Sequence, residues 1–117
     1  MNLQIHELVG SNCITLEDGQ IVYDKIYPEL KSGRAVELDF KDVKLFASPF
    51  FNGAIGQLFR DFSSDDLNRR LKMQGLTANG SIVLRKVIEN AKVYYSSPQA
   101  KNAIESVVDG REGGGER

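Results

Sequence analysis

The chain has 117 residues, which is enough for one domain with a modest hydrophobic core. Its 15 basic and 16 acidic side chains leave a net charge of −1, so no strong field would draw in nucleic acid or an anionic membrane. No apolar run approaches the roughly 20 residues that span a bilayer, and the first ten residues lack a signal-peptide pattern. We therefore expect a cytoplasmic protein that has no membrane partner.

The chain contains one cysteine, Cys13, and one histidine, His6. A single cysteine cannot form an internal disulfide, which agrees with a reducing compartment. The usual four-ligand zinc site needs more ligands than these, and no glycine-rich phosphate-binding loop is present, so we predict no metal and no cofactor. Cys13 and His6 could form a nucleophilic pair, but both lie in or beside a predicted strand, where a packing role is favoured.

The first third of the chain predicts a strand, a helix and a second strand. Residues 3–9 begin with alternating apolar and polar side chains, as in a half-buried strand. Thr15 is a suitable N-cap for the helix that follows, Pro28 would kink or shorten that helix, and Gly33 would end it. Residues 35–40 suit a strand in the middle of a sheet. The helix is expected to bury Ile21, Val22, Ile26 and Leu30.

A single helix is predicted over residues 49–62. Its apolar side chains recur at helical spacing on one face, and they are Phe51, Ile55, Leu58 and Phe62. Ser48 in front of it is a candidate N-cap, and Pro49 suits the first turn. Gly53 and Gly56 each cost about 1 kcal/mol in a helix relative to alanine. Either they pack closely against another part of the fold, or they form a smooth patch that a partner approaches.

The second half of the chain predicts a short strand over residues 67–73, with Leu71 and Met73 inward, and a second amphipathic helix over residues 81–95. Ser97 and Pro98 would begin a last helix. The expected inward side chains of the 81–95 helix are Ile82, Val83, Val87, Ile88, Ala91 and Tyr94 or Tyr95; those of the last helix are Ile104, Val107 and Val108.

This order of elements predicts an α/β fold. Strands that alternate with helices favour a small, mostly parallel sheet, here of three or four strands flanked by about four helices. We expect one domain over residues 1–97, a C-terminal helix over residues 98–109 packed on it, and a flexible polar tail over residues 110–117.

The run IYPELKSGRAVELDFKDVKLFASPFFNGAIGQLF resembles the STAS-like domain of bacteria, a relative of the sulfate-transporter and anti-sigma-factor-antagonist (STAS) group. The likeness covers about residues 14–96. It rests on a helix that ends near Pro28, a strand that ends in Asp39, and the helix opening at residues 48–56. In the family this opening usually reads Ser-Ser-Phe-Leu, two acidic residues, Ala, Phe and Gly. Here Pro49 stands at the usual phosphoacceptor position, and Asn52 and Gly53 replace the acidic pair.

The resemblance implies a non-catalytic regulatory role. STAS antagonists bind a histidine-kinase-like ATPase, which phosphorylates a serine at the start of this helix. The implied partner is therefore a protein, namely such an ATPase, and Ser48 is the candidate phosphoacceptor, although its local setting favours a cap. We expect one ring of the aromatic pair to anchor the helix and the other to face the partner. The candidate partner-binding residues are Ser48, Pro49, Phe50, Phe51, Asn52 and Gly53.

Two other classes of function stay open. Asp39 and Ser48 at the ends of strands could serve a small ligand, a nucleotide or an enzymatic reaction, although an aspartate there more often fixes a turn. The basic residues Arg69, Arg70 and Lys72 lie in the predicted edge strand, with Arg60 the fourth member of the cluster; charges there protect an edge from aggregation. Nucleic-acid binding is disfavoured, because the chain is nearly neutral and has no aromatic stacking motif. The oligomeric state stays open.

Overall fold

A computed structural model describes residues 1–96 of the chain. The predicted C-terminal helix over residues 98–109, its Ser97–Pro98 start and the tail over residues 110–117 lie outside the described residues. In residues 1–96 the strands form two parallel sheets. The larger has the order β1 (Asn2–Gln4), β3 (Val36–Asp39) and β5 (Leu71–Gln74), and the smaller pairs β2 (Asn12–Cys13) with β4 (Leu45–Phe46).

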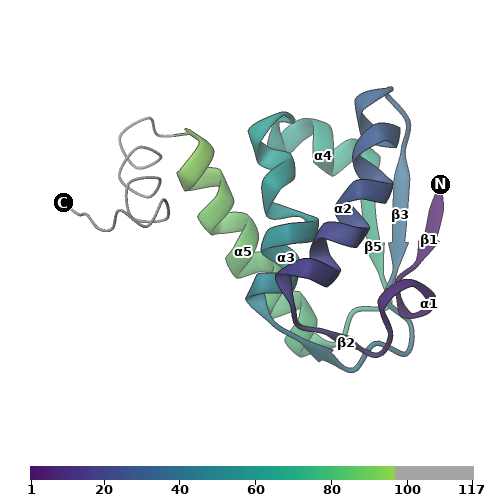
Figure 1. Cartoon of the computed structure of the whole chain (residues 1–117). Helices are drawn as coiled ribbons and strands as arrows, with labels where there is room; N and C mark the ends of the chain where they lie inside the picture. The colour runs from purple at the N-terminus through teal and green to yellow at the C-terminus, as the bar shows by residue number, and fades with distance from the viewer. Residues whose placement is uncertain (97–117) are drawn as a thin grey trace.

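The helices of the described chain are α1 (Ile5–Val9), α2 (Leu16–Lys31), α3 (Ser48–Ala54), the 3-10 helix η1 (Gly56–Arg60), α4 (Ser64–Arg70) and α5 (Ala78–Ser96). Figure 1 shows α2, α3 and α5 on one side of the larger sheet. The helices cover the apolar face of the sheet. Successive side chains of a strand point to opposite faces, and the register aligns the apolar ones on one face. The inner face carries Leu3, Val36, Leu38, Leu71 and Met73, and the outer face carries Asn2, Gln4, Glu37, Asp39, Lys72 and Gln74. The predicted α/β class and parallel sheet are confirmed.

Several local predictions are confirmed in the first half. The Thr15 hydroxyl oxygen accepts a hydrogen bond from the Asp18 backbone N–H at 3.1 Å, as an N-cap does. Gly33 has a φ of +88° just beyond the helix end, and β3 is the central strand. The helix does not stop at Pro28 but continues to Lys31, and its residue Ile21 is exposed while Tyr23 is buried. The inward prediction for Ile21 is therefore wrong.

The predicted strand over residues 3–9 is mostly wrong, because it gives way to helix α1 at Ile5. Its weak alternation, with Glu7 and Leu8 out of phase, already fitted a strand poorly. The pairing of β2 with β4 is absent from the predictions, since two-residue strands carry no periodic signal. Helix α4 is also a correction to the predicted strand over 67–73, of which only the part from Leu71 onward is strand.

The capping of α4 explains the second correction. The Ser63 hydroxyl accepts from the Asp66 backbone N–H at 3.1 Å. Asp66 in turn accepts hydrogen bonds from Arg69 at 2.8 Å and Arg70 at 3.0 Å, one turn further along the helix. These local bonds stabilise seven residues as a helix immediately before the strand.

The predicted single helix over 49–62 is interrupted. Helix α3 ends at Ala54, Ile55 is the break, and η1 follows with tighter bonds such as Leu58 N–H to Ile55 C=O at 2.9 Å. Phe51, Ile55 and Leu58 are buried as predicted, and Phe62 is partly buried. In α5 the inward prediction is wrong for Ile82, which is 63 % exposed, and Leu84 is buried instead. Among residues 1–96 no helix is long and apolar enough to cross a membrane.

Candidate functional site

Two helices begin side by side, because the strands before them are paired. Cys13 of β2 pairs with Phe46 of β4 in parallel, and the Ala47 backbone N–H donates to the Cys13 carbonyl at 2.9 Å. The chain then enters α2 at Leu16 and α3 at Ser48. The first turns of α2 and α3 therefore lie next to each other. The six residues predicted for partner binding all lie in α3.

Two glycines allow this close contact. A Cβ atom on Gly19 of α2 would lie 2.1 Å from the Phe50 carbonyl oxygen, and one on Gly53 of α3 would lie 2.8 Å from the Leu16 carbonyl oxygen. The open question about Gly53 is thus answered in favour of backbone packing. Gly56 differs. A Cβ atom placed on it would meet Val87 Cγ1 as its nearest neighbour at 3.6 Å, which is an ordinary contact distance.

Phe50 and Phe51 are both fully buried, so the prediction that one ring faces a partner is wrong. The ring of Phe51 stacks on Phe46 with centroids 5.7 Å apart, and meets Phe40 at 6.0 Å and Phe50 at 5.3 Å. Helix α3 packs against α2 and also against α5. Neighbouring helical positions about 100° apart can both be covered when a helix is enclosed from two sides.

Ser48 is the first residue of α3 and does not cap it. The N-cap position belongs to Ala47, which has no side-chain oxygen and makes no capping bond, so the predicted cap is wrong. Pro49 lies in the first turn as predicted. Ser48, Pro49 and Asn52 are exposed, whereas Gly53 is buried. Of the six predicted partner-binding residues, these three have side chains that a partner could touch.

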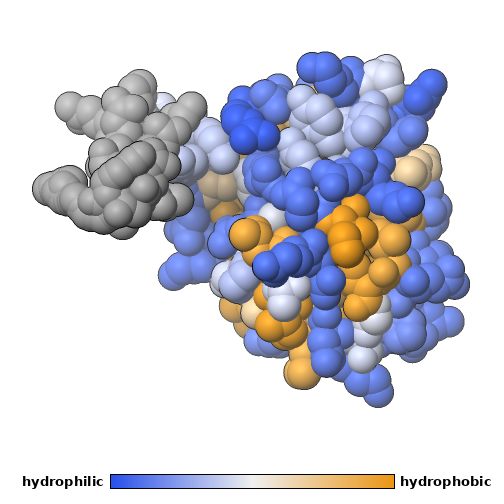
Figure 2. Space-filling model, viewed as in Figure 1, coloured by the Kyte–Doolittle hydropathy of each residue, from blue (hydrophilic) through white to orange (hydrophobic). Residues whose placement is uncertain are grey.

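Two exposed apolar residues of the α2 entrance complete this region. Leu16 is 53 % exposed and Ile14 is 38 % exposed. The Leu16 Cδ1 atom would lie 3.1 Å from a Cβ placed on Gly53, so this side chain borders α3 directly. We call Ile14, Leu16, Ser48 and Pro49 the α2–α3 surface, whereas Asn52 lines a hollow together with Asn90 and Ala91 of α5. Figure 2 shows apolar groups that interrupt the polar surface near the start of α2.

Leu16 is absent from the residues predicted for partner binding. The available signal was its position directly after the cap residue Thr15, six residues before the first buried valine of the helix, Val22. A leucine at that point contributes little to the core and is free to face outward. Recognising it as part of a site requires knowing that β2 and β4 pair, and that pairing is not readable from two-residue strands.

A pair of serine and threonine substitutions tests the assignment of the caps. Ser48→Ala should change the free energy of unfolding by no more than about 0.5 kcal/mol, because its hydroxyl satisfies no helix N–H. Thr15→Ala should lower it by about 1 kcal/mol, because a real capping bond is lost. Urea unfolding measures both. An equal loss in the two variants would show that Ser48 is a cap after all.

Cys13 and His6 do not form a nucleophilic pair in this fold. Cys13 is fully buried, and burial, with a smaller contribution from Asp18, raises the pKa of its thiol to about 12. The reactive thiolate is therefore scarce at neutral pH. His6 is exposed on α1. No cluster of three or more histidine, cysteine or acidic side chains within residues 1–96 is arranged to hold a metal ion.

Asp39 and the basic residues named for the other two functional classes make contacts within the fold. The Asp39 carboxylate accepts a hydrogen bond from the Lys41 backbone N–H at 3.0 Å, which fixes the turn after β3. Arg70 donates to the Leu30 carbonyl at 2.6 Å as well as to Asp66, and its hydrogen bond lowers the pKa of Asp66. Arg69 and Arg70 belong to α4, so only Lys72 of that trio lies on the edge strand, which corrects the prediction.

Comparison with known proteins identifies a family. A family model described as "STAS-like domain of unknown function (DUF4325)" matches residues 18–81. No curated protein and no solved structure matches the chain. The matched range runs from the first turn of α2 into the first turn of α5. It includes Ser48, Pro49 and Asn52 and both glycines of the helix contact, while Ile14 and Leu16 precede it.

Proposed function

Because the chain belongs to the family of STAS-like domains, we propose that it is a small regulatory module that acts by binding another protein. The proposed binding region is the α2–α3 surface, and the proposed partner is a histidine-kinase-like ATPase of the kind that STAS antagonists bind. The module would work without a cofactor in a reducing bacterial cytoplasm, which suits its buried thiol. It would regulate its partner by binding to it, and it would not catalyse a reaction.

The exposure of Leu16 beside α3 is the observation that carries this proposal. An apolar side chain bordered by polar groups resembles the centre and rim of a protein interface. Here Leu16 and Ile14 would supply the apolar centre, and Ser48 would supply a polar margin. The glycine contact fixes the two helix starts relative to each other, and Gln57 adds a hydrogen bond to Gln20 at 2.9 Å. A surface held in this way loses little entropy when a partner binds.

Ser48 gives the proposed surface a means of control. Its side chain is exposed and is not engaged in capping. A phosphate there would add nearly two negative charges at the start of α3 and would disfavour an apolar contact on this surface. Incubation with the cognate ATPase and ATP, followed by intact-mass measurement, tests this step. A mass gain that Ser48→Ala abolishes supports it, and an unchanged mass rejects phosphorylation at this residue.

Affinity capture from the native host tests the binding proposal. The unmodified chain should retain a histidine-kinase-like ATPase, identified by mass spectrometry. Leu16→Glu should reduce its recovery at least about tenfold, because a charge replaces the apolar centre of the contact. The control is Val93→Glu, an equally charged change at a residue of similar exposure, 59 %, that lines a different hollow with Phe59 and Phe62. Equal recovery with both variants would refute the proposed surface.

A further inference from the structure

A hollow lies beside the helix break at Ile55, between the α3–η1 segment and α5. It measures about 330 Å³, at the lower end of the range of small-molecule sites. Asn52, Gly56 and Gln57 line it from the α3–η1 segment, and Asn90, Ala91 and Tyr94 line it from α5. We call it the asparagine hollow. It is separate from the α2–α3 surface, and neither Asp39 nor Ser48 lines it.

Three carboxamides supply the polar groups of the asparagine hollow. The Gln57 side-chain nitrogen donates to the Gln20 side-chain oxygen at 2.9 Å and to the Gly53 carbonyl at 2.8 Å. Both of its N–H groups are therefore engaged, which leaves its oxygen as an acceptor for a ligand. The Asn52 side-chain oxygen would lie 3.7 Å from a Cβ placed on Gly56, so this amide borders the floor of the hollow. Asn52 and Asn90 are exposed, and each amide offers both donors and an acceptor.

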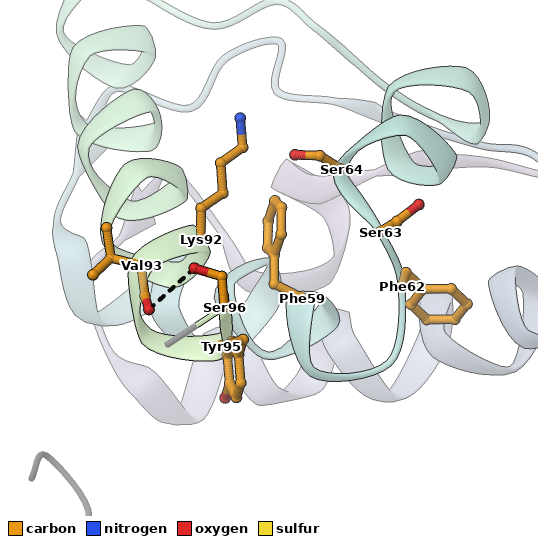
Figure 3. Close-up of a pocket in the computed structure, with 8 residues that line it drawn as sticks. All are labelled: Phe59, Phe62, Ser63, Ser64, Lys92, Val93, Tyr95 and Ser96. Carbon is orange, nitrogen blue, oxygen red and sulfur yellow. Dashed lines mark hydrogen bonds between the residues drawn. The ribbon is translucent and has the colours of Figure 1, made fainter. Parts of the chain in front are cut away.

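The described residues that line the asparagine hollow carry no charge. The neighbouring hollow, of about 390 Å³, shares Tyr95 with it but is lined by Lys92 and Phe62. Figure 3 shows Lys92 and Tyr95 extending from α5 in opposite directions, so the Lys92 amine belongs to that neighbouring hollow. A ligand with a phosphate, carboxylate or ammonium group would meet no opposite charge on this lining, and removing water from an unpaired charge is costly. The lining therefore favours an uncharged ligand.

We propose that the asparagine hollow binds a small uncharged sugar. A sugar hydroxyl both donates and accepts hydrogen bonds, so it can pair with either end of a carboxamide. The C–H faces of a sugar ring are apolar, and they match the methyl group of Ala91 and the rings of Tyr94 and Tyr95, whose centroids lie 4.6 Å apart. Apolar surface with a few polar groups that fix the orientation of the ligand is the usual composition of a small-molecule site.

Magnetic resonance titration of the isotope-labelled full chain with glucose and with N-acetylglucosamine tests the ligand class. The backbone amides of Gly56, Asn90 and Ala91 should shift, with a Kd on the order of 1 mM, as the usual binding free energy per non-hydrogen atom gives for ligands of this size. Glucuronate, in which a carboxylate replaces the hydroxymethyl group of glucose, should bind at least about tenfold more weakly than glucose, because its charge has no partner. No shift with either sugar, equal affinity for glucuronate, or tighter binding of adenosine would overturn the proposal.

Variants of the same chain test the location of the site. Asn90→Leu removes an exposed amide and should weaken sugar binding about fivefold, the value of one hydrogen bond. The matched control, Asn68→Leu, makes the same change at an exposed residue of α4 and should leave binding unchanged. Gly56→Ala should keep the fold but weaken binding, because its methyl group would narrow the hollow between Val87 and Asn52. Sugar affinity that neither Asn90→Leu nor Gly56→Ala changes would overturn the assignment of this site.

Discussion

Replacing Phe51 by alanine should lower the free energy of unfolding by about 3–5 kcal/mol, the usual range for a fully buried phenylalanine. The ring touches three other aromatic rings and stacks almost parallel on Phe46, at an interplanar angle of 3°. Its removal leaves a cavity that the strand β4 and helix α3 cannot both collapse to fill. Urea unfolding monitored by circular dichroism measures the loss.

Phe62→Ala is the control for this prediction. Phe62 is only partly buried, and its contacts are with Tyr27 at 5.8 Å and with the Arg70 guanidinium at 5.6 Å. Its loss should therefore cost less than that of Phe51. A Phe51→Ala protein that is as stable as Phe62→Ala would mean that Phe51 is not central to the core. The assignment of the aromatic pair to packing, and not to partner contact, would then fail.

Gly19→Ala should destabilise the protein by about 3 kcal/mol, at the upper end of the usual cost of overpacking. The new methyl group would lie 2.1 Å from the Phe50 carbonyl oxygen and 3.0 Å from the Ala54 backbone nitrogen, and backbone atoms cannot move aside as a flexible side chain can. The helices α2 and α3 would have to separate. Thermal melts and the urea midpoint report the loss, and a partner-binding measurement reports any disturbance of the α2–α3 surface.

The same substitution at Gly56 is the matched control. A methyl group there meets only ordinary contacts, at 3.6 Å and beyond, and the backbone does not need a positive φ. Gly56→Ala should therefore be neutral or stabilise the fold by up to about 1 kcal/mol, because alanine has fewer unfolded conformations. If Gly19→Ala were equally harmless, the close approach of α2 to α3 would not exist in solution.

The features that the sequence predicted well are those that depend on near neighbours in the chain. Thr15 caps α2, Asp39 fixes the turn after β3, and Phe51, Ile55 and Leu58 are buried. Each prediction depends on a helix cap, a turn or the helical spacing of apolar residues, and residues close together in the sequence define all three. The parallel sheet follows from the alternation of elements, and the family resemblance agreed with it.

The features that it predicted poorly depend on distant contacts. Phe50 is buried because α2 and α5 cover α3 from different sides, which adjacent residues cannot reveal. The contact of Gly19 with α3 joins residues more than thirty positions apart. The exposure of Leu16 beside Gly53 follows from that contact and from the pairing of β2 with β4. The predicted contact through Phe50 or Phe51 is therefore wrong, while a partner-binding role for the exposed start of α3 stays a prediction.

A nuclear magnetic resonance titration tests the proposed binding surface most directly. The isotope-labelled full chain would be titrated with the ATPase recovered by affinity capture, and shifts of the backbone amides would be mapped on the fold. We expect the largest shifts at Ile14, Leu16 and Ser48. Shifts confined to Glu37 and Lys72 on the outer face of the sheet, or no shifts at all, would contradict binding at the α2–α3 surface.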